Sequence, residues 1–523
     1  MPLGQDPAFD EAQRARAARV LTVEVVFSTT CDKVVTGVLL TAFALQLGAN
    51  NALIGTLAAV GFWAQLLQGP GVILIERWRR RRAITVLTSL VSAIAPAMMA
   101  GLAFAAPGGS AQTGLILAVA LYTGAGAIGG CAWNAWVRDA VSDDVRGRFN
   151  GRRSSLSSGV AVVSGLFAAW VLDRVPEGDA GRAAVFAGLF ALAFLAQLAS
   201  AWCLSRAPEP PMPPPPPQPA RLLPLLGEPL RHPNYRRLIA FLASWQFAVN
   251  LARPFLTVFL LSQLGFSMTF VMVVNLVSQF ANMLSMHRWG ALADRFGNKS
   301  VLNVAAPLFV GCIAALVVAS QIQPRTLAGI YVLLVALVMG VASAGVALAS
   351  NGITQKLSPP GAAASFLATN GLISAAAAGV ASILGGLTAD AFAQRALALA
   401  LQWEGPHYDA AMQFAIHHWD FYFLISALLG LYALHRMTLV REEGELDRRT
   451  MISRMLADRR TRGDDPAAAQ PGAAPWDLLL RERAQRRRGR RPVSTAPTTE
   501  APDARLLPHP GHRRHRGPDQ HRT

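Results

Sequence analysis

The sequence predicts an all-α membrane protein with twelve transmembrane helices in two pseudo-symmetric six-helix bundles. Three observations support this fold class: few charged residues, repeated long apolar runs, and landmarks that recur at one offset. The chain has 523 residues, of which 52% are hydrophobic and 15% charged, and its mean hydropathy is +0.34. Because a soluble domain carries roughly a quarter charged residues, lipid is the expected solvent.

The apolar runs have the length of membrane-spanning helices. A helix of about 20 residues, rising 1.5 Å per residue, crosses roughly 30 Å of hydrocarbon. Residues 1–19 are charged and irregular, unlike a cleavable signal, so we expect the first span to be retained. The twelve spans are expected at 20–46, 51–75, 84–106, 113–137, 154–173, 183–205, 237–262, 267–287, 301–320, 327–350, 362–389 and 419–438.

Arginines are concentrated in alternate loops, and this pattern predicts the orientation. Clusters lie at 77–82, 138–153, 231–237 and 295–299, whereas the intervening loops hold only Arg174, Arg182, Arg325 and Arg395. By the positive-inside rule the arginine-rich loops and both termini face the cytoplasm. The net charge of +17 therefore indicates membrane topology rather than nucleic-acid binding. We expect a multi-pass protein of the cell membrane, specifically a bacterial inner membrane.

The two halves of the chain share landmarks, which indicates a duplicated six-span unit. "QLG" at 46–48 recurs at 263–265, and Asn134 and Phe149 recur as Asn351 and Phe366, each shifted by 217 residues. "ERW" at 76–78 answers "DRF" at 294–296, shifted by 218. Three matches in chain order at nearly one offset favour duplication over chance.

The domain boundaries follow from these spans and from composition. The linker contains "APEPPMPPPPPQPARLLPLLGEP", which cannot be a transmembrane helix because consecutive prolines lack N–H donors. It is a stiff spacer or a site for a proline-binding partner. The tail is rich in Pro, Ala and Arg and is expected to be disordered, either solvated or attracted to anionic lipid headgroups. The expected domains are the N-terminal segment 1–19, the first bundle 20–205, the linker 206–236, the second bundle 237–438 and the basic tail 439–523.

The loop "GALADRFGNK" after the eighth span closely resembles the signature loop of the major facilitator superfamily, G-x-L-a-D-r-x-G-r-k. Gly290, Asp294, Arg295, Gly297 and Lys299 fall at its motif positions. In the first-half copy Glu76 and Arg77 stand at the acidic and basic positions, and Arg79 stands in place of the second glycine. The resemblance implies two bundles that rock about a central site, and these loop residues, Asp294 above all, as a conformational latch on the cytoplasmic side.

Charged and polar residues inside the spans indicate where a solute binds. A charge in the hydrocarbon region costs at least about 2.5–3.5 kcal/mol on insertion scales, so it usually faces a partner or a watery cavity. In the first span Asp32 and Lys33 are adjacent and share one helix face with Thr29 and Thr36. Glu24, nearer the cytoplasmic end, is expected to be a surface residue that extends toward water.

The seventh and eighth spans each carry a polar stripe. Gln246, Asn250, Arg253 and Thr257 are spaced by four, three and four residues, and Asn275, Gln279 and Asn282 follow the same spacing. If Asp32 pairs with Lys33, Arg253 lacks a carboxylate in its own span; if Asp32 reaches Arg253, Lys33 is the spare cation. Both arrangements favour an anionic solute. The expected substrate-binding residues are Asp32, Lys33, Gln246, Asn250, Arg253, Asn275 and Gln279.

The sequence therefore predicts a secondary active transporter of a small solute, an organic anion, that works by alternating access. It is not expected to be an enzyme, because no nucleotide-binding or catalytic motif is present. It is expected to be a monomer. The four cysteines lie inside spans without metal-ligand spacing, so no metal site and no cofactor are expected. Asp32 is the candidate carrier if transport is coupled to protons. The alternative function is a non-transporting receptor or assembly factor on the same fold.

Overall fold

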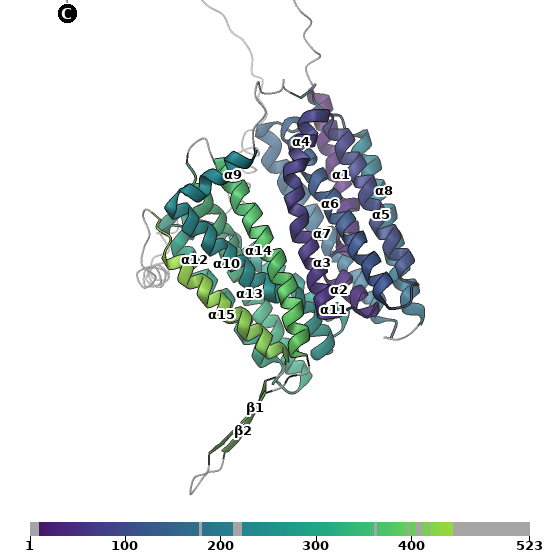
Figure 1. Cartoon of the computed structure of the whole chain (residues 1–523). Coiled ribbons are helices and arrows are strands. Elements are labelled where there is room, and N and C mark those ends of the chain that lie inside the picture. The colour runs from purple at the N-terminus through teal and green to yellow at the C-terminus, as the bar shows by residue number, and fades with distance from the viewer. Residues whose placement is uncertain are drawn as a thin grey trace, which may run out of the picture. The chain divides into compact units, whose positions relative to one another are not determined.

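Helices from the first half of the chain form one bundle in the computed structural model (Figure 1). The structure describes residues 10–442 apart from 177–179, 213–221, 360–362, 394, 396, 404–409 and 417. The helices of this bundle are α1 (Glu11–Val35), α2 (Gly37–Gln46), α3 (Asn51–Ala64), α4 (Gln68–Trp78), α5 (Arg81–Leu102), α6 (Gly109–Ala140), α7 (Asp143–Asp173) and α8 (Ala180–Arg206), with a 3₁₀ turn (Gln65–Leu67) joining α3 to α4.

Helices from the second half form the other bundle, and a short helix in the linker precedes it. A five-residue π-helical segment, Phe259–Gln263, ends the seventh span. The elements are α9 (Leu222–Arg231), α10 (Pro233–Val258), α11 (Met268–Phe296), α12 (Asn298–Ala319), α13 (Arg325–Lys356), α14 (Ala363–Phe392), the antiparallel hairpin β1 (Leu397–Trp403) and β2 (Ala410–Ile416), and α15 (His418–Thr438). Both bundles and the expected all-α class are confirmed; the hairpin between α14 and α15 was not expected.

The linker and the tail are described only in part. α9 lies within the linker, and α10 begins at Pro233, a residue suited to the first turn of a helix because its N–H would have no partner there. The first four tail residues, 439–442, continue directly from α15. Residues 213–221 of the linker and 443–523 of the tail lie outside the described residues, so the predictions for them stay predictions.

The first span is one long helix, Glu11–Gln46, that breaks at Thr36 in its second half. α1 begins at Glu11, well before the expected start at 20, and ends at Val35. Thr36 is extended and Gly37 has φ +66°, a conformation that only glycine adopts without strain. The break places Asp32 and Lys33 in the last turn of α1, where a cation interacts favourably with the helix dipole.

The backbone repeats the offset found in the sequence. Gly48 has φ +71° and Gly265, 217 residues later, has φ +61°. Each glycine turns the chain before the next span begins. The two "QLG" segments therefore end the first spans of the two bundles with the same left-handed residue.

The outer surface of both bundles suits a lipid environment. Within the described residues, eleven helical stretches are long and apolar enough to cross a membrane. α10, a helix of 26 residues, completes the expected twelve; its mean hydropathy is lowered by the polar stripe that includes Gln246 and Arg253. Many large apolar side chains are exposed on the spans, among them Leu117, Val163, Leu284 and Leu428.

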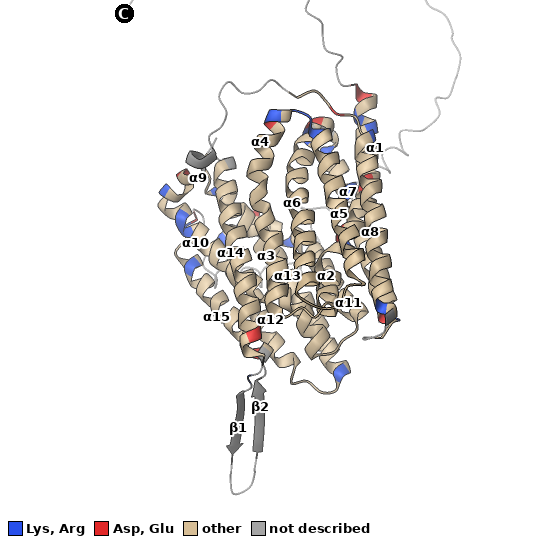
Figure 2. Cartoon of the chain, turned by 45° about the vertical axis from the view of Figure 1, so that its right-hand side comes forward, with Lys and Arg blue, Asp and Glu red and all other residues tan. Residues whose placement is uncertain are grey.

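Charged residues distinguish the two ends of the bundles. Arginines gather near the upper ends of α1, α4 and α10 (Figure 2). We call this end the arginine-rich side; it holds the α4–α5 turn, the linker and the α11–α12 turn. The opposite side holds the α5–α6, α7–α8, α12–α13 and α14–α15 connections.

Glu24 is not a surface residue, and the expectation for it is wrong. It is 4% exposed, and its carboxylate accepts hydrogen bonds from Arg153 on α7 (2.9 Å) and from Ser200 on α8 (2.8 Å). A carboxylate is stable here because a cation and a hydroxyl from two neighbouring helices satisfy it. Glu24 thus joins three helices of the first bundle.

Glu24→Gln is expected to destabilise the first bundle, because it leaves the Arg153 guanidinium without its counter-charge. The loss should be about 2 kcal/mol, below the roughly 3–5 kcal/mol of a fully buried pair, since the Arg153 side chain is 23% exposed. The midpoint of thermal unfolding in detergent measures it. Glu11→Gln, at the exposed start of the same helix, is the control and should change little; equal midpoints for the two variants would contradict the assignment.

Candidate functional site

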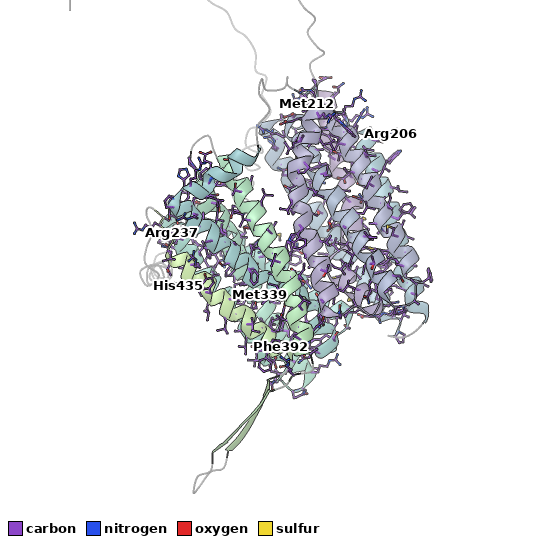
Figure 3. All side chains as sticks on the ribbon, in the orientation of Figure 1. Arg206, Met212, Arg237, Met339, Phe392 and His435 are labelled. Carbon is purple, nitrogen blue, oxygen red and sulfur yellow. The ribbon has the colours of Figure 1, made fainter. Side chains whose placement is uncertain are left out.

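A central cavity of about 1050 Å³ is the main candidate site. Most of its lining comes from the second bundle, on helices α10 to α15, and the first bundle contributes residues of the α3–α4 segment and Cys131. Met339 on α13, marked in Figure 3, is one lining residue. On the α3–α4 segment the lining runs from Phe62 to Val72, from the middle toward the arginine-rich side, whereas on α11 it runs from Val274 to Asn282, nearer the arginine-poor end, so the cavity lies around the middle of the spans.

The cavity lining combines neutral polar groups with aromatic rings. Trp245 and Phe309 pack together with ring centroids 5.6 Å apart, and both line the cavity. Arg253 is the one charged side chain among the described residues of the lining. The amide and hydroxyl residues are Gln65, Gln68, Gln246, Thr257, Asn275, Ser278, Asn282, Ser343, Ser350, Asn351, Asn370 and Ser374.

Arg253 lies in the last turns of α10, exposed toward the cavity. Within the part of the chain that the structure describes, its guanidinium forms no hydrogen bond or ion pair. Five N–H donors are therefore directed at a space lined by neutral groups. An unpaired guanidinium in this position is suited to bind an anion.

The remaining residues of the α10 stripe divide between the cavity and the helix packing. Gln246 and Thr257 line the cavity. Asn250 is 3% exposed and its amide donates to the Gln246 carbonyl oxygen at 2.8 Å, so the structure places it inside the bundle rather than in the lining. A nearby serine, Ser382, donates to the Asn250 carbonyl oxygen at 3.3 Å.

The α11 stripe is split in the same way. Asn275 and Asn282 line the cavity, and the Asn282 amide donates to Ser343 on α13 at 2.8 Å. Gln279 is exposed and is not part of the lining. A period of 3.5 residues keeps a stripe on one face only approximately, so its members diverge between cavity and surface.

Asp32 and Lys33 form an ion pair with 3.4 Å between Oδ2 and Nζ. Neither lines the central cavity as described. Thr36 donates its hydroxyl to the Asp32 backbone oxygen at 2.6 Å across the helix break. The sequence left two arrangements open, and the structure has the first: Asp32 pairs with Lys33, and Arg253 is the spare cation.

The contribution of the α3–α4 segment was missed from the sequence. Gln65 and Gln68 line the cavity where the helix changes to a 3₁₀ turn, and the Gln68 amide donates to the Gln65 side chain. The segment "QLLQGPG" carried a signal, since Pro70 and two glycines interrupt an apolar run. Broken helices near mid-membrane often mark binding sites.

The signature loop forms a tight turn between α11 and α12. Gly297 has φ +86° and both ends α11 and begins α12. Arg79 at the corresponding place in the first half has φ +53°, so the turn keeps a left-handed residue although the glycine is missing. At Gly297 the motif glycine adopts this left-handed conformation without strain.

Glu442, just after α15, holds this turn to the rest of the second bundle. Its carboxylate accepts from the backbone N–H of Lys299 at 2.6 Å and from Lys356 Nζ at 3.0 Å. Burial alone raises the pKa of the Glu442 carboxyl, but the hydrogen bond from Lys299 and the hydrogen bond and charge of Lys356 outweigh it, so the pKa lies below its usual value. The side chain of Lys299 is itself buried.

In the first bundle a corresponding cluster of charged residues surrounds the start of α5. Arg81, 2% exposed at the start of α5, forms ion pairs with Asp139 and with Glu209, the latter at 3.7 Å. Its guanidinium also donates to the Pro210 carbonyl oxygen at 3.0 Å. Residues 139 and 356 differ by 217 and both end the fourth span of their bundle. The equivalent positions therefore carry opposite charges, an aspartate in the first half and a lysine in the second.

The other predicted latch residues lie on the arginine-rich side without a shared contact. Asp294 is exposed in the last turn of α11, and among the described residues its carboxylate has no hydrogen-bond or ion-pair partner. The Arg295 guanidinium lies over the Phe296 ring, 5.1 Å from its centroid. Glu76 and Arg77 are exposed on α4, and Gly290 lies within α11 in ordinary contact distance of Leu348.

Comparison with known proteins identifies the family. The sequence model of the Major Facilitator Superfamily matches residues 25–386. The chain belongs to this superfamily. No curated protein matches it.

Solved structures share the fold at low sequence identity. The nucleoside transporter NupG superposes with a TM-score of 0.61 and 14% identity, covering 82% of this chain and 100% of that one. A bacterial homologue of the human lysosomal transporter Spinster, inward-facing and occupied, gives 0.57 and 15%, covering 85% and 100%. The xylose transporter XylE from E. coli, in an inward-open conformation, gives 0.57 and 13%, covering 83% and 99%. At these identities the likeness shows the fold alone.

Membership of the superfamily, together with the membrane spans, determines the broad function. The protein is a multi-pass membrane transporter of small solutes and not an enzyme. Its recognition from the signature loop is confirmed. The match ends at residue 386, so it includes that loop and all but the last span.

Glu442→Gln is expected to lower the stability of the second bundle by about 1–2 kcal/mol at neutral pH, because two charge-assisted hydrogen bonds are weakened. A carboxyl whose pKa is lowered by folding stabilises fully above its unfolded pKa of about 4.3 and loses this contribution as pH falls through the folded value. The difference in unfolding midpoint between wild type and Glu442→Gln should therefore narrow below about pH 4. Glu228→Gln on α9 is the control, and a difference that stays constant down to pH 3 would refute the assignment.

Proposed function

We propose that the protein transports an organic anion by alternating access, with Arg253 as the residue that binds its carboxylate or similar anionic group. The observation that carries this proposal is the isolation of Arg253. It is the one charged side chain among the described residues of a 1050 Å³ cavity, and the other polar groups around it are neutral.

Charge balance favours an anionic ligand. A guanidinium at the depth of the membrane is expensive unless water or a counter-ion accompanies it. Asp32 is paired with Lys33, so the candidate carboxylate of the first span already has a counter-charge. A bound anion would neutralise Arg253, and the planar guanidinium offers two parallel hydrogen bonds to a carboxylate.

The rest of the lining favours an organic rather than an inorganic anion. Trp245, Phe309, Phe62 and Phe423 supply apolar and aromatic surface. Amides such as Gln246 and Asn275 supply neutral donors and acceptors at other points of the wall. A cavity of this size with few convergent polar groups is typical of sites for small organic molecules.

The arginine distribution supports the orientation. With the arginine-rich side in the cytoplasm, both termini are cytoplasmic, as the positive-inside rule requires. A bacterial inner membrane fits the same rule. Direct contacts between the bundles, α3 with α14 and α7 with α11, include the ends of these helices on the opposite side. This arrangement corresponds to an inward-open state.

Three further assignments belong to the same proposal. The transporter acts as a monomer, since each chain contains a full pair of bundles. Proton coupling, if present, acts through Asp32, the carboxylate beside the break of the first span. The basic tail contacts anionic lipid headgroups, where a cation near the surface contributes up to about 1 kcal/mol.

A receptor or assembly factor on the same fold is the second candidate function. It would retain the fold and the ion pairs but move no solute. Substrate-dependent flux into proteoliposomes separates the two functions, because only a transporter equilibrates the solute across the membrane.

Arg253→Lys is expected to weaken organic-anion transport by about tenfold or more, because it keeps the charge but loses the bidentate geometry. Arg253→Gln should reduce transport to background. Arg237→Lys on the arginine-rich surface is the matched control and should transport like wild type. Flux in proteoliposomes measures all three, and equal flux for wild type and both Arg253 variants would reject Arg253 as a substrate ligand.

Asp294→Asn is expected to shift the resting population toward the inward-facing state by about 1–2 kcal/mol. In the latch role, the Asp294 carboxylate forms a contact only when the cytoplasmic side closes. In the present inward-open arrangement it has no partner among the described residues. Distances between spin labels at Asn150 and Gln355, one on each bundle, measure the shift. Glu228→Gln is the control and should leave the distance distribution unchanged. The same distribution for Asp294→Asn and wild type would contradict the latch role.

A further inference from the structure

Asp173 connects the first bundle to the second on the arginine-poor side. It is the last residue of α7, and its two carboxylate oxygens accept from the backbone N–H groups of Met268 and Thr269, both at 2.8 Å. These are the first two residues of α11. Ser267, the N-cap of α11, accepts from the third N–H, that of Phe270, at 3.2 Å.

Asp390 makes the reciprocal connection from the second bundle to the first. It lies near the end of α14, and its two carboxylate oxygens accept from the backbone N–H groups of Asn51 (3.0 Å) and Ala52 (2.8 Å). These are the first two residues of α3. Asn50, the N-cap of α3, accepts from the third N–H, that of Leu53, at 3.0 Å.

The two connections are related by the internal repeat. Positions 173 and 390 differ by 217, as do 51 and 268, the same offset that relates the "QLG" turns immediately before α3 and α11. Carboxylate, N-cap and helix start therefore recur together at one offset. Because each contact joins one half of the chain to the other, the repeat places one connection on each pair of equivalent helices.

Each connection closes a helix crossing between the bundles. α3 packs against α14, where an added Cβ at Gly55 would overlap the Ser382 carbonyl oxygen and one at Gly386 would overlap that of Asn51. α7 packs against α11, where a Cβ at Gly165 would meet Met272 Sδ at 3.6 Å. Positions 55 and 272, and 165 and 382, again differ by 217.

The physical effect of each connection depends on the distance between the bundles. The first N–H groups of a helix lack intrahelical partners and carry a partial positive charge, which a carboxylate satisfies strongly. Each carboxylate lies on one bundle and its helix start lies on the other. The hydrogen bonds therefore exist only while the arginine-poor ends of the bundles are together.

We propose that Asp173 and Asp390 are paired clasps that hold the arginine-poor side closed, and that both must release for the cavity to open there. They are positioning residues of the transport cycle, acting on the helix starts of α11 and α3 rather than on the solute. The inference rests on alternating access as proposed above. It does not depend on the nature of the substrate.

The test measures the distance between the bundles on both sides in the full-length protein without substrate. Spin labels at Ala106 and Thr326 report the arginine-poor side, and labels at Asn150 and Gln355 report the arginine-rich side, in a background lacking the four native cysteines. Asp173→Asn and Asp390→Asn keep the side-chain shape. Each variant loses the negative charge, and the NH₂ group of the new amide faces one of the two backbone N–H donors, from which it cannot accept a hydrogen bond.

Each single variant should move the ratio of closed to open arginine-poor sides by about tenfold toward open. The double variant should move it by about a hundredfold, because the two clasps share no residue. The distribution from Ala106 to Thr326 then gains longer distances while that from Asn150 to Gln355 gains shorter ones. Glu228→Gln, which removes a carboxylate from α9, is the control and should leave both distributions unchanged.

Asn51→Pro is an independent test that keeps both carboxylates. Proline is tolerated at the first position of a helix and removes one N–H that Asp390 binds, and Asn50 before it is already extended, as a residue preceding proline must be. This variant should shift both distributions in the same direction as Asp390→Asn.

Unchanged distributions in both single variants, the double variant and Asn51→Pro would overturn the proposal and leave the carboxylates as ordinary helix caps. The readout is separate from that of the proposed substrate. Arg253 variants that lose anion flux keep wild-type distances if the clasps are assigned correctly, and clasp variants shift distances whether or not the solute is an anion.

Discussion

The main direct contacts between the two bundles are two helix crossings, α3 with α14 and α7 with α11, and smaller contacts join α10 to α2 and α3, and α14 to the 3₁₀ turn. Because carboxylates satisfy the helix starts of α3 and α11 at the arginine-poor ends of these crossings, the bundles stay together there. The cavity lies around the middle of the spans and is lined by both bundles. A protein joined along the full length of both bundles would have no space for a solute and no movement to expose it.

Ion pairs outside the cavity stabilise the individual bundles. Glu24 with Arg153 joins helices within the first bundle, and Glu442 and Arg81 hold the turns before α12 and α5. These groups are satisfied inside one bundle, so each bundle moves as a unit. Arg253, in contrast, has neutral neighbours in the cavity and is the group whose charge a solute would complete.

Much of the fold could be predicted from the sequence, because membrane spans and an internal repeat leave long patterns. The signature loop predicted the family, and the repeated "QLG" predicted equivalent ends of the first span in each half, which the structure shows as left-handed glycines at 48 and 265. The site was predictable in part: Arg253, Gln246 and Asn275 line the cavity, but Asn250 and Gln279 do not. Helical spacing identifies a face without showing what covers it.

The role of Asp173 was not visible, because its partners are backbone N–H groups, which any sequence supplies. Glu24 was misassigned because its partners come from helices more than a hundred residues away.

The central claim is that an anionic group of the solute completes the charge of the cavity. Thermal stability of the purified wild-type protein with matched pairs of small organic acids and their primary amides tests it most directly, because each pair differs in charge and little in shape. At about 100 times its dissociation constant a ligand stabilises by roughly 2.7 kcal/mol. We expect some acids to raise the unfolding midpoint and their amides to have no effect. Equal stabilisation by an acid and its amide would contradict the claim.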